Sequence, residues 1–177
     1  MNNPRPLVSI ALCSALLGLL SQCSLPLPAG VPLTLQTFAV ALFGCFLGGG
    51  GGCCCVLVWL LLGAAGLPVF SGVQGGVAVL FGPTGGFLWG FLLLALFCGM
   101  GNSPHKGRAS FLRYALCGAF GLILCHGLGV GWFAFVTHQP LWTAALAVSV
   151  PYLLKDILSL ILARSACALL WRRRSGR

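Results

Sequence analysis

Long apolar runs separated by proline and glycine are the feature that most limits how this chain can fold. The 177 residues include 10 lysines and arginines and one acidic residue, so that 6% of the chain is charged. A soluble globular domain carries roughly 25% charged residues. So few charges do not cover a water-exposed surface, and the apolar side chains must therefore face lipid. We predict an integral membrane protein.

The length of the runs sets the number of spans. A membrane-spanning helix needs about 20 apolar residues, so the chain has room for about six spans in a single membrane domain, residues 1–177. The expected spans are residues 7–25, 34–52, 53–69, 87–101, 111–136 and 142–171, the last interrupted at Pro151. A glycine-rich stretch, residues 70–86, is too broken to be helical throughout. The predicted fold class is all-α.

Two connections between the expected spans carry no charge and are rich in proline and glycine, residues 27–32 and 67–86. Non-helical backbone at membrane depth survives only where it is buried in protein or lines a cavity, and transporters build binding sites from such segments. We therefore expect both connections to face outward and to line a binding cavity. The alternative is a plain surface loop.

The basic residues predict the orientation. Arg5 precedes the first expected span, Lys106 and Arg108 lie between the fourth and fifth, and four arginines end the chain. Cytoplasmic loops collect lysine and arginine, and an even number of spans places all three groups on one side. We expect both termini in the cytoplasm and the chain in the plasma or inner membrane, surrounded by lipid. Arg164 lies inside the last apolar run and is expected to extend toward the cytoplasmic surface.

The net charge of +9 does not indicate a nucleic-acid partner, because the basic residues lie at loop edges and not in one patch. Most of the ten cysteines lie inside apolar runs, where a thiol packs as a small apolar group. No cysteine or histidine spacing matches a zinc site, so no metal and no cofactor are expected. The run from Leu7 to Leu20 resembles a signal peptide, but we interpret it as an uncleaved first helix.

Asp156 is the only acidic residue in the chain. A charge at the centre of a bilayer costs about 2.5–3.5 kcal/mol on insertion scales, so an aspartate in an apolar segment is a candidate functional residue. The alternative is a cap at the start of the last helix, where acidic residues are favoured.

Three stretches in a fixed order resemble a known family. Residues 32–37 read Pro-Leu-Thr-Leu-Gln-Thr, residues 61–70 read Leu-Leu-Gly-Ala-Ala-Gly-Leu-Pro-Val-Phe, and residues 82–87 read Gly-Pro-Thr-Gly-Gly-Phe. The chain therefore resembles the BioY family, the biotin-specific substrate-binding subunits of energy-coupling-factor transporters. The resemblance is strong from about residue 28 to residue 91 and weaker elsewhere.

The resemblance implies a binding subunit that captures biotin from outside and passes it inward. The chain has no Gly-x-x-x-x-Gly-Lys-Ser/Thr phosphate loop, so ATPase and transmembrane coupling subunits are expected as separate chains, or the protein works as a homo-oligomer. We expect no enzymatic activity. Two alternatives stay open: a subunit for another vitamin, and a small intramembrane enzyme. An enzyme needs an acid–base or metal-binding group of residues, and the chain offers only one aspartate and three histidines for it.

The chain departs from the family pattern in two places. Relatives carry Gly-Pro-Lys/Arg after the second span, where this chain has the glycine run 48–52. In the last span, relatives show Pro-aromatic-Leu-Pro-Gly-Asp-x-x-Lys, whereas residues 151–159 here read Pro-Tyr-Leu-Leu-Lys-Asp-Ile-Leu-Ser. Asp156 is retained, Ser159 replaces the lysine of the pattern, and a lysine appears instead at Lys155.

The resemblance implies that Asp156 accepts the two N–H groups of the biotin ureido ring, because a carboxylate is an acceptor-only group. The biotin carboxylate needs donors. Candidates are Lys155, Ser159 on the same helix face, and the backbone N–H groups of Gly85 and Gly86 if these begin a helix. The alternative for the two glycines is a tight turn.

The remaining candidate residues are weaker. Thr84 lies in the third stretch, directly before the two glycines. His126 is either a ligand contact or a buried imidazole bonded to a backbone carbonyl, and Trp132 contacts either the apolar bicycle or lipid. Thr34 and Gln36 contact the ligand or satisfy loop backbone.

Ala11 and Ala15 lie four residues apart in the first expected span. Small residues at this spacing give a flat face for close helix approach, and the resemblance implies that this face docks a coupling subunit.

Overall fold

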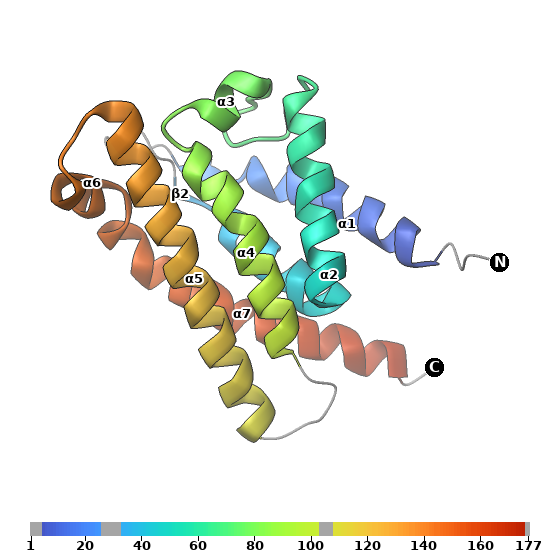
Figure 1. The fold of residues 1–177 in the computed structure, drawn as a ribbon. Coiled ribbons are helices and arrows are strands. Elements are labelled where there is room, and N and C mark those ends of the chain that lie inside the picture. The colour runs from blue at the N-terminus through green and yellow to red at the C-terminus, as the bar shows by residue number, and fades with distance from the viewer. Residues whose placement is uncertain (1–4, 26–32, 103–107, 176–177) are drawn as a thin grey trace.

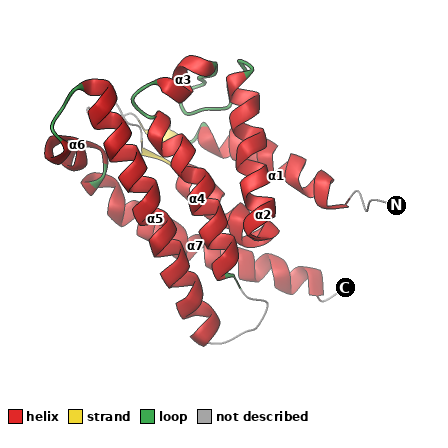
Figure 2. Ribbon diagram, in the orientation of Figure 1, coloured by secondary structure: helices red, strands yellow, loops and turns green. Residues whose placement is uncertain are grey.

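The structure, a computed structural model, describes residues 5–25, 33–102 and 108–175. These residues are almost entirely helical, with one two-stranded antiparallel sheet (Figures 1 and 2). The elements in chain order are α1 (Arg5–Ser21), β1 (Ser24–Leu25), β2 (Leu33–Thr34), α2 (Gln36–Ala64), α3 (Val77–Phe81), α4 (Gly85–Gly101), α5 (Arg108–Thr137), α6 (Leu141–Val148) and α7 (Val150–Ser175). Expected loop 27–32 lies outside the described residues.

Helix α2 contains both the second and the third expected span, joined by a sharp bend. Gly48 has φ 79° and ψ 166°, a backbone conformation that is not helical and that glycine adopts without steric cost. A Cβ built on Gly52 would lie 2.6 Å from the Cα of Gly44, although eight residues of a straight helix span about 12 Å. The two arms, residues 36–47 and 49–64, therefore turn back on each other, as Figure 1 shows. The glycine run is the bend between them.

The third expected span was placed too far along the chain, to Val69. The second arm of α2 ends at Ala64, because Gly66 has φ 96° and the backbone N–H of Leu67 donates to the carbonyl of Leu62. This hydrogen bond and the left-handed glycine form a Schellman cap, which terminates a helix. Residues 67–76 are consequently free to form a loop.

The break in the last span was also predicted at the wrong residue. Helices α6 and α7 meet at Ser149 with a bend of 49°, and Pro151 is the second residue of α7. Proline is tolerated in the first turn of a helix, because the N–H that it lacks has no partner there. Pro151 therefore begins a helix instead of interrupting one.

The apolar helices agree with the predicted fold class. Helix α2 and most of α5 are long and apolar enough to cross a membrane, and the bent pair α6–α7 counts as a third candidate; α1 and α4 are shorter apolar helices. Helix α4 packs between α2 and α5 (Figure 1). A Cβ on Gly99 of α4 would lie 2.2 Å from the backbone nitrogen of Gly49, so these helices touch backbone to backbone. Large apolar side chains such as Phe135 point outward.

Arg164 is anchored by polar partners on either side of the α4–α5 connection, and the side of the membrane that it faces stays a prediction. Its guanidinium donates to Asn102 Oδ1 at 2.8 Å and to Ser110 Oγ at 3.1 Å, and it lies 5.7 Å from the centre of the Tyr114 ring. Asn102 and Ser110 end α4 and begin α5. The charge is thus half-buried in a polar cluster that ties α7 to the junction of these two helices.

Candidate substrate-binding site

A cavity of about 480 Å³ lies between α2, α4, α5 and α7 and is closed on one side by the loop before α3. Its size falls in the usual range of small-molecule sites, roughly 300–1,000 Å³. Phe70, Ser71 and Gly72 of the expected loop 67–86 line it, as does Thr84. This loop is therefore a cavity wall, as the sequence predicted. Phe87, Phe91, Leu122 and Val148 give the cavity apolar surface.

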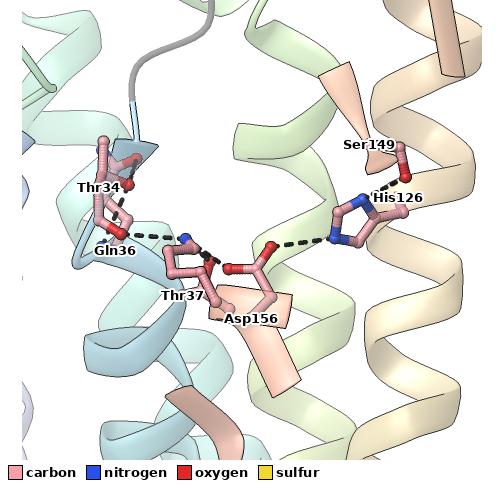
Figure 3. Close-up of polar contacts among 7 residues, drawn as sticks. Thr34, Gln36, Thr37, His126, Ser149 and Asp156 are labelled. Atoms are coloured by element: carbon pink, nitrogen blue, oxygen red, sulfur yellow. Dashed lines mark hydrogen bonds and ion pairs between the residues drawn. The ribbon is translucent and has the colours of Figure 1, made fainter. Parts of the chain in front are cut away.

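Asp156 is the centre of the polar group in this cavity, shown in Figure 3. Its side chain projects from α7 and is 5% exposed. Oδ2 lies 3.0 Å from His126 Nε2 of α5, and Oδ1 forms an ion pair with the ammonium of Lys155. Two cation-capable side chains from two helices thus surround the one carboxylate of the chain.

His126 connects Asp156 to the break between α6 and α7. Its Nδ1 lies 2.8 Å from Ser149 Oγ, and Ser149 is the residue at the bend. Each ring nitrogen therefore has one side-chain partner, the carboxylate at Nε2 and the serine hydroxyl at Nδ1. The ring also meets Phe87 edge to face, with 5.8 Å between the ring centres.

Lys155 ties α7 to the start of α2. Its ammonium donates to the carbonyl of Thr34 at 3.0 Å and to Thr37 Oγ1 at 3.3 Å. Its side chain is 20% exposed and lines the cavity. Burying an ammonium is costly unless it is paired and hydrogen-bonded, and here one carboxylate and two oxygen acceptors meet that need.

Thr34 and Gln36 satisfy backbone at the start of α2, as expected, and their contact with ligand stays a prediction. The Thr34 hydroxyl donates to Gln36 Oε1 at 3.1 Å and accepts from the Gln36 backbone N–H at 3.3 Å. Both residues also line the cavity. They therefore order the first turn of α2 and lie at the cavity wall.

Six of the predicted binding residues line this one cavity, and four do not. The six are Thr34, Gln36, Thr84, His126, Lys155 and Asp156, and the four are Gly85, Gly86, Trp132 and Ser159. Ser159 is as buried as Asp156 and follows it by nearly one helical turn, but it lies outside the cavity wall. Its contact with ligand stays a prediction, and the cavity gives it no support.

Gly85 and Gly86 begin a helix, as proposed, because α4 starts at Gly85 with Thr84 as its N-cap residue. Their glycine identity has a packing reason. A Cβ on Gly86 would lie 2.3 Å from the Cβ of Trp132, and the Trp132 indole donates to the carbonyl of Gly82 at 2.9 Å. Trp132 thus holds the turn before α4 and neither lines the cavity nor simply faces lipid.

The two structural alternatives for the central residues are wrong. Asp156 is the seventh residue of α7, which begins at Val150, so it does not cap that helix. His126 is bonded to the side chains of Asp156 and Ser149 and not to a backbone carbonyl. The polar group is therefore assembled between side chains of three helical segments.

Sequence reasoning missed several residues of the site. Phe70, Ser71, Gln74 and Tyr152 line the cavity, and Thr37 supports Lys155. Phe70 and Thr37 lie inside the stretches that resemble the BioY family, so their position in those stretches could have marked them as site residues. Ser71 and Gln74 follow directly after such a stretch. Nothing in the sequence marked Ser149, whose role comes from the bend.

The described residues, 5–25, 33–102 and 108–175, contain no group of three or more histidines, cysteines or acids that could hold a metal ion. The cavity instead combines flat aromatic walls with one carboxylate, one ammonium, one imidazole and several hydroxyl and amide groups. This combination suits a small molecule that has both apolar and polar parts.

A mainly helical membrane protein with such a cavity between its helices belongs to the class of membrane-embedded small-molecule-binding proteins. A sequence model of the BioY family matches residues 1–176. The chain belongs to the BioY family.

Two relatives and one solved structure are similar to the chain over most of its length. The biotin transporter BioY of Thermotoga maritima is 38% identical over 160 residues, which cover 90% of this chain and 91% of that protein. The biotin transporter BioY2 of Lactococcus lactis subsp. cremoris is 37% identical over 157 residues, covering 88% and 84%. The crystal structure of the S-component for biotin from an ECF-type ABC transporter matches with a TM-score of 0.83 at 25% identity, covering 97% of this chain and 95% of that one.

Proposed function

We propose that this chain binds biotin from the outer side of the membrane and mediates its uptake as the substrate-specific subunit of a vitamin transporter. The observation that carries the proposal is the buried Asp156 cluster at the wall of a cavity of about 480 Å³, in a chain whose relatives are biotin transporters. The ureido N–H groups of biotin would donate to Asp156, which is the only carboxylate that the chain offers.

Lys155 is the proposed partner of the biotin carboxylate. Among the described residues that line the cavity, Lys155 is the one with a permanently basic side chain, and it forms an ion pair with Asp156. Ser159, which stands where the family pattern has lysine, lies outside the cavity wall. The family pattern has its lysine three residues after Asp156, at the position of Ser159. In this chain the proposed lysine is Lys155, which directly precedes Asp156 and lies about one helical turn before Ser159.

The assembly and orientation are further parts of the proposal. Ala11 and Ala15 lie on an exposed apolar face of α1, together with Leu12 and Leu16. This face is available for a transmembrane coupling subunit, which would work with separate ATPase subunits. Both termini would lie in the cytoplasm, because the basic residues of the sequence gather at the chain ends and between α4 and α5.

An intramembrane enzyme is the other class of function. Ser149, His126 and Asp156 are connected in the order of a hydrolase triad. Ser149 does not line the cavity, however, so its hydroxyl is not presented to a bound substrate. The transporter relatives also favour binding.

Mass spectrometry of the protein purified from biotin-containing medium tests the proposal. We expect intact biotin to be released from the denatured protein at close to one molecule per chain. A purified, folded protein that neither carries biotin nor binds it on titration would rule the proposal out. Release of a chemically altered biotin would favour the enzyme instead.

A further inference from the structure

Gln22 lies just beyond the end of α1, outside every role assigned so far, and its amide lies within hydrogen-bonding distance of four backbone groups. Nε2 donates to the carbonyls of Gly18 at 3.2 Å, Pro68 at 3.1 Å and Phe70 at 3.1 Å. Oε1 accepts the backbone N–H of Val73 at 2.9 Å. Three carbonyls face the nitrogen and one N–H faces the oxygen, so the amide fits in only one orientation.

The loop that Gln22 holds is the wall of the cavity. Phe70, Ser71 and Gly72 all line the cavity, and the Gln22 amide contacts the backbone on both sides of Ser71 and Gly72. Phe70 is further fixed by a bridge with Gln74 and by an edge-to-face contact with the ring of Trp59, at 5.1 Å between ring centres. Phe70 therefore anchors one end of this loop segment, and the hydrogen bond from the Val73 N–H to Gln22 anchors the other end.

Val73 is held in a conformation that it would not adopt by itself. Its φ is 59°, in the left-handed region, which a β-branched side chain disfavours. Its side chain is 70% exposed, so packing does not compensate for this strain. Backbone strain of this kind persists only where the surrounding structure holds it and gathers at functional sites. The Phe70–Gln74 bridge closes the turn around Val73, and the hydrogen bond from the Val73 N–H to Gln22 holds Val73 itself.

We propose that Gln22 is a positioning residue of the substrate site, which fixes the Phe70–Val73 wall from the end of α1 in its ligand-binding conformation. The inference rests on the proposed biotin binding and extends it. It also connects two parts of the protein, because α1 carries the face proposed for docking and ends at this amide. A movement of α1 would then reach the cavity wall through one side chain.

Gln22→Leu removes the amide contacts to all four backbone groups and keeps a side chain of similar size. If the loop then leaves its strained conformation, only a fraction of molecules is competent to bind, and the apparent dissociation constant rises by the inverse of that fraction. The strain of a left-handed non-glycine residue, about 1–3 kcal/mol, corresponds to a loss of about 5- to 150-fold in biotin affinity. Calorimetry on the purified full chain in detergent measures it.

A second substitution separates positioning from general stabilisation. Glycine adopts positive φ without strain, so Val73→Gly in the Gln22→Leu background should recover part of the lost affinity. A residue that served only overall stability would not be rescued in this way. Gln139→Leu, a change at an exposed glutamine in the connection between α5 and α6, is the matched control and should bind as the parent does.

Amide hydrogen exchange of the peptide covering residues 66–76 reads the loop without ligand. We expect slow exchange in the parent and fast exchange in Gln22→Leu. Faster exchange with unchanged biotin affinity, or unchanged exchange, would overturn the proposal even if the parent binds biotin tightly. A parent that binds no biotin would instead defeat the proposed function, while the exchange comparison would still decide whether Gln22 holds this wall.

Discussion

Asp156→Asn is the substitution that most directly tests how the site works. It preserves the shape of the side chain but replaces one acceptor oxygen with an NH2 donor and removes the negative charge. The ureido N–H groups of biotin would then meet a donor. A hydrogen bond to a charged group contributes about 1.5–3 kcal/mol, so we expect biotin affinity to fall about 10- to 150-fold.

The structure predicts a second consequence for the ligand-free protein. Asp156 is the only acid in the chain, so no other carboxylate can pair with Lys155 once the charge is gone. The ammonium would keep the Thr34 carbonyl and the Thr37 hydroxyl. Breaking a fully buried pair from one side costs about 3–5 kcal/mol, and the partial exposure of Lys155 reduces this cost. The melting temperature should therefore fall modestly.

Two measurements separate these effects. Titration calorimetry reports the affinity and the fraction of binding-competent protein, and a thermal melt without biotin reports stability. The double variant Lys155→Met/Asp156→Asn should regain melting temperature, because no ammonium is left unpaired, but it should not regain affinity. Ser165→Ala, at an exposed serine of the same helix, is the control. Binding by Asp156→Asn within about twofold of the parent would show that the acid is not a ligand contact.

Four further predictions concern the other proposed parts of the molecule. Lys155→Met should weaken binding of biotin more than that of biotin amide, which lacks the carboxylate; equal losses by calorimetry would remove Lys155 from that role. Gly99→Leu should prevent stable folding, seen as loss of the monodisperse peak on size exclusion, because its Cβ would lie 2.2 Å from the α2 backbone; a normal melting temperature would contradict this packing. Changing Ala11 or Ala15 to leucine should leave biotin binding intact but lower uptake by cells, and loss of binding in detergent would argue against a docking face. A reporter that is active only outside the cytoplasm, fused after Arg177, should be inactive; activity would reverse the proposed orientation.

The helical segments were largely predictable because their cause is local. A run of apolar residues near 20 long must satisfy its own backbone in lipid and therefore forms a helix. The starts of α4 and α5 were found within a few residues. One error occurred at Leu25, which pairs in β1 beyond the end of α1. The others occurred at Val69 and Pro151, where hydrogen bonds at a cap and at a bend decided the boundary. Such bonds depend on backbone angles that composition does not reveal.

The sequence by itself determined the membrane class and the family, and it marked Asp156 as the candidate functional residue, since a lone acid among apolar residues is costly wherever it lies. Only the tertiary structure decided its partners. His126, which contacts the carboxylate, lies 30 residues from Asp156 along the chain. Ser149 joins the cluster through His126, and Thr34 joins it through Lys155, from which it is 121 residues distant in sequence. They meet because α2 turns at Gly48 and the last span bends at Ser149. Long-range contacts of this kind arise from helix packing, which no pattern within one segment specifies.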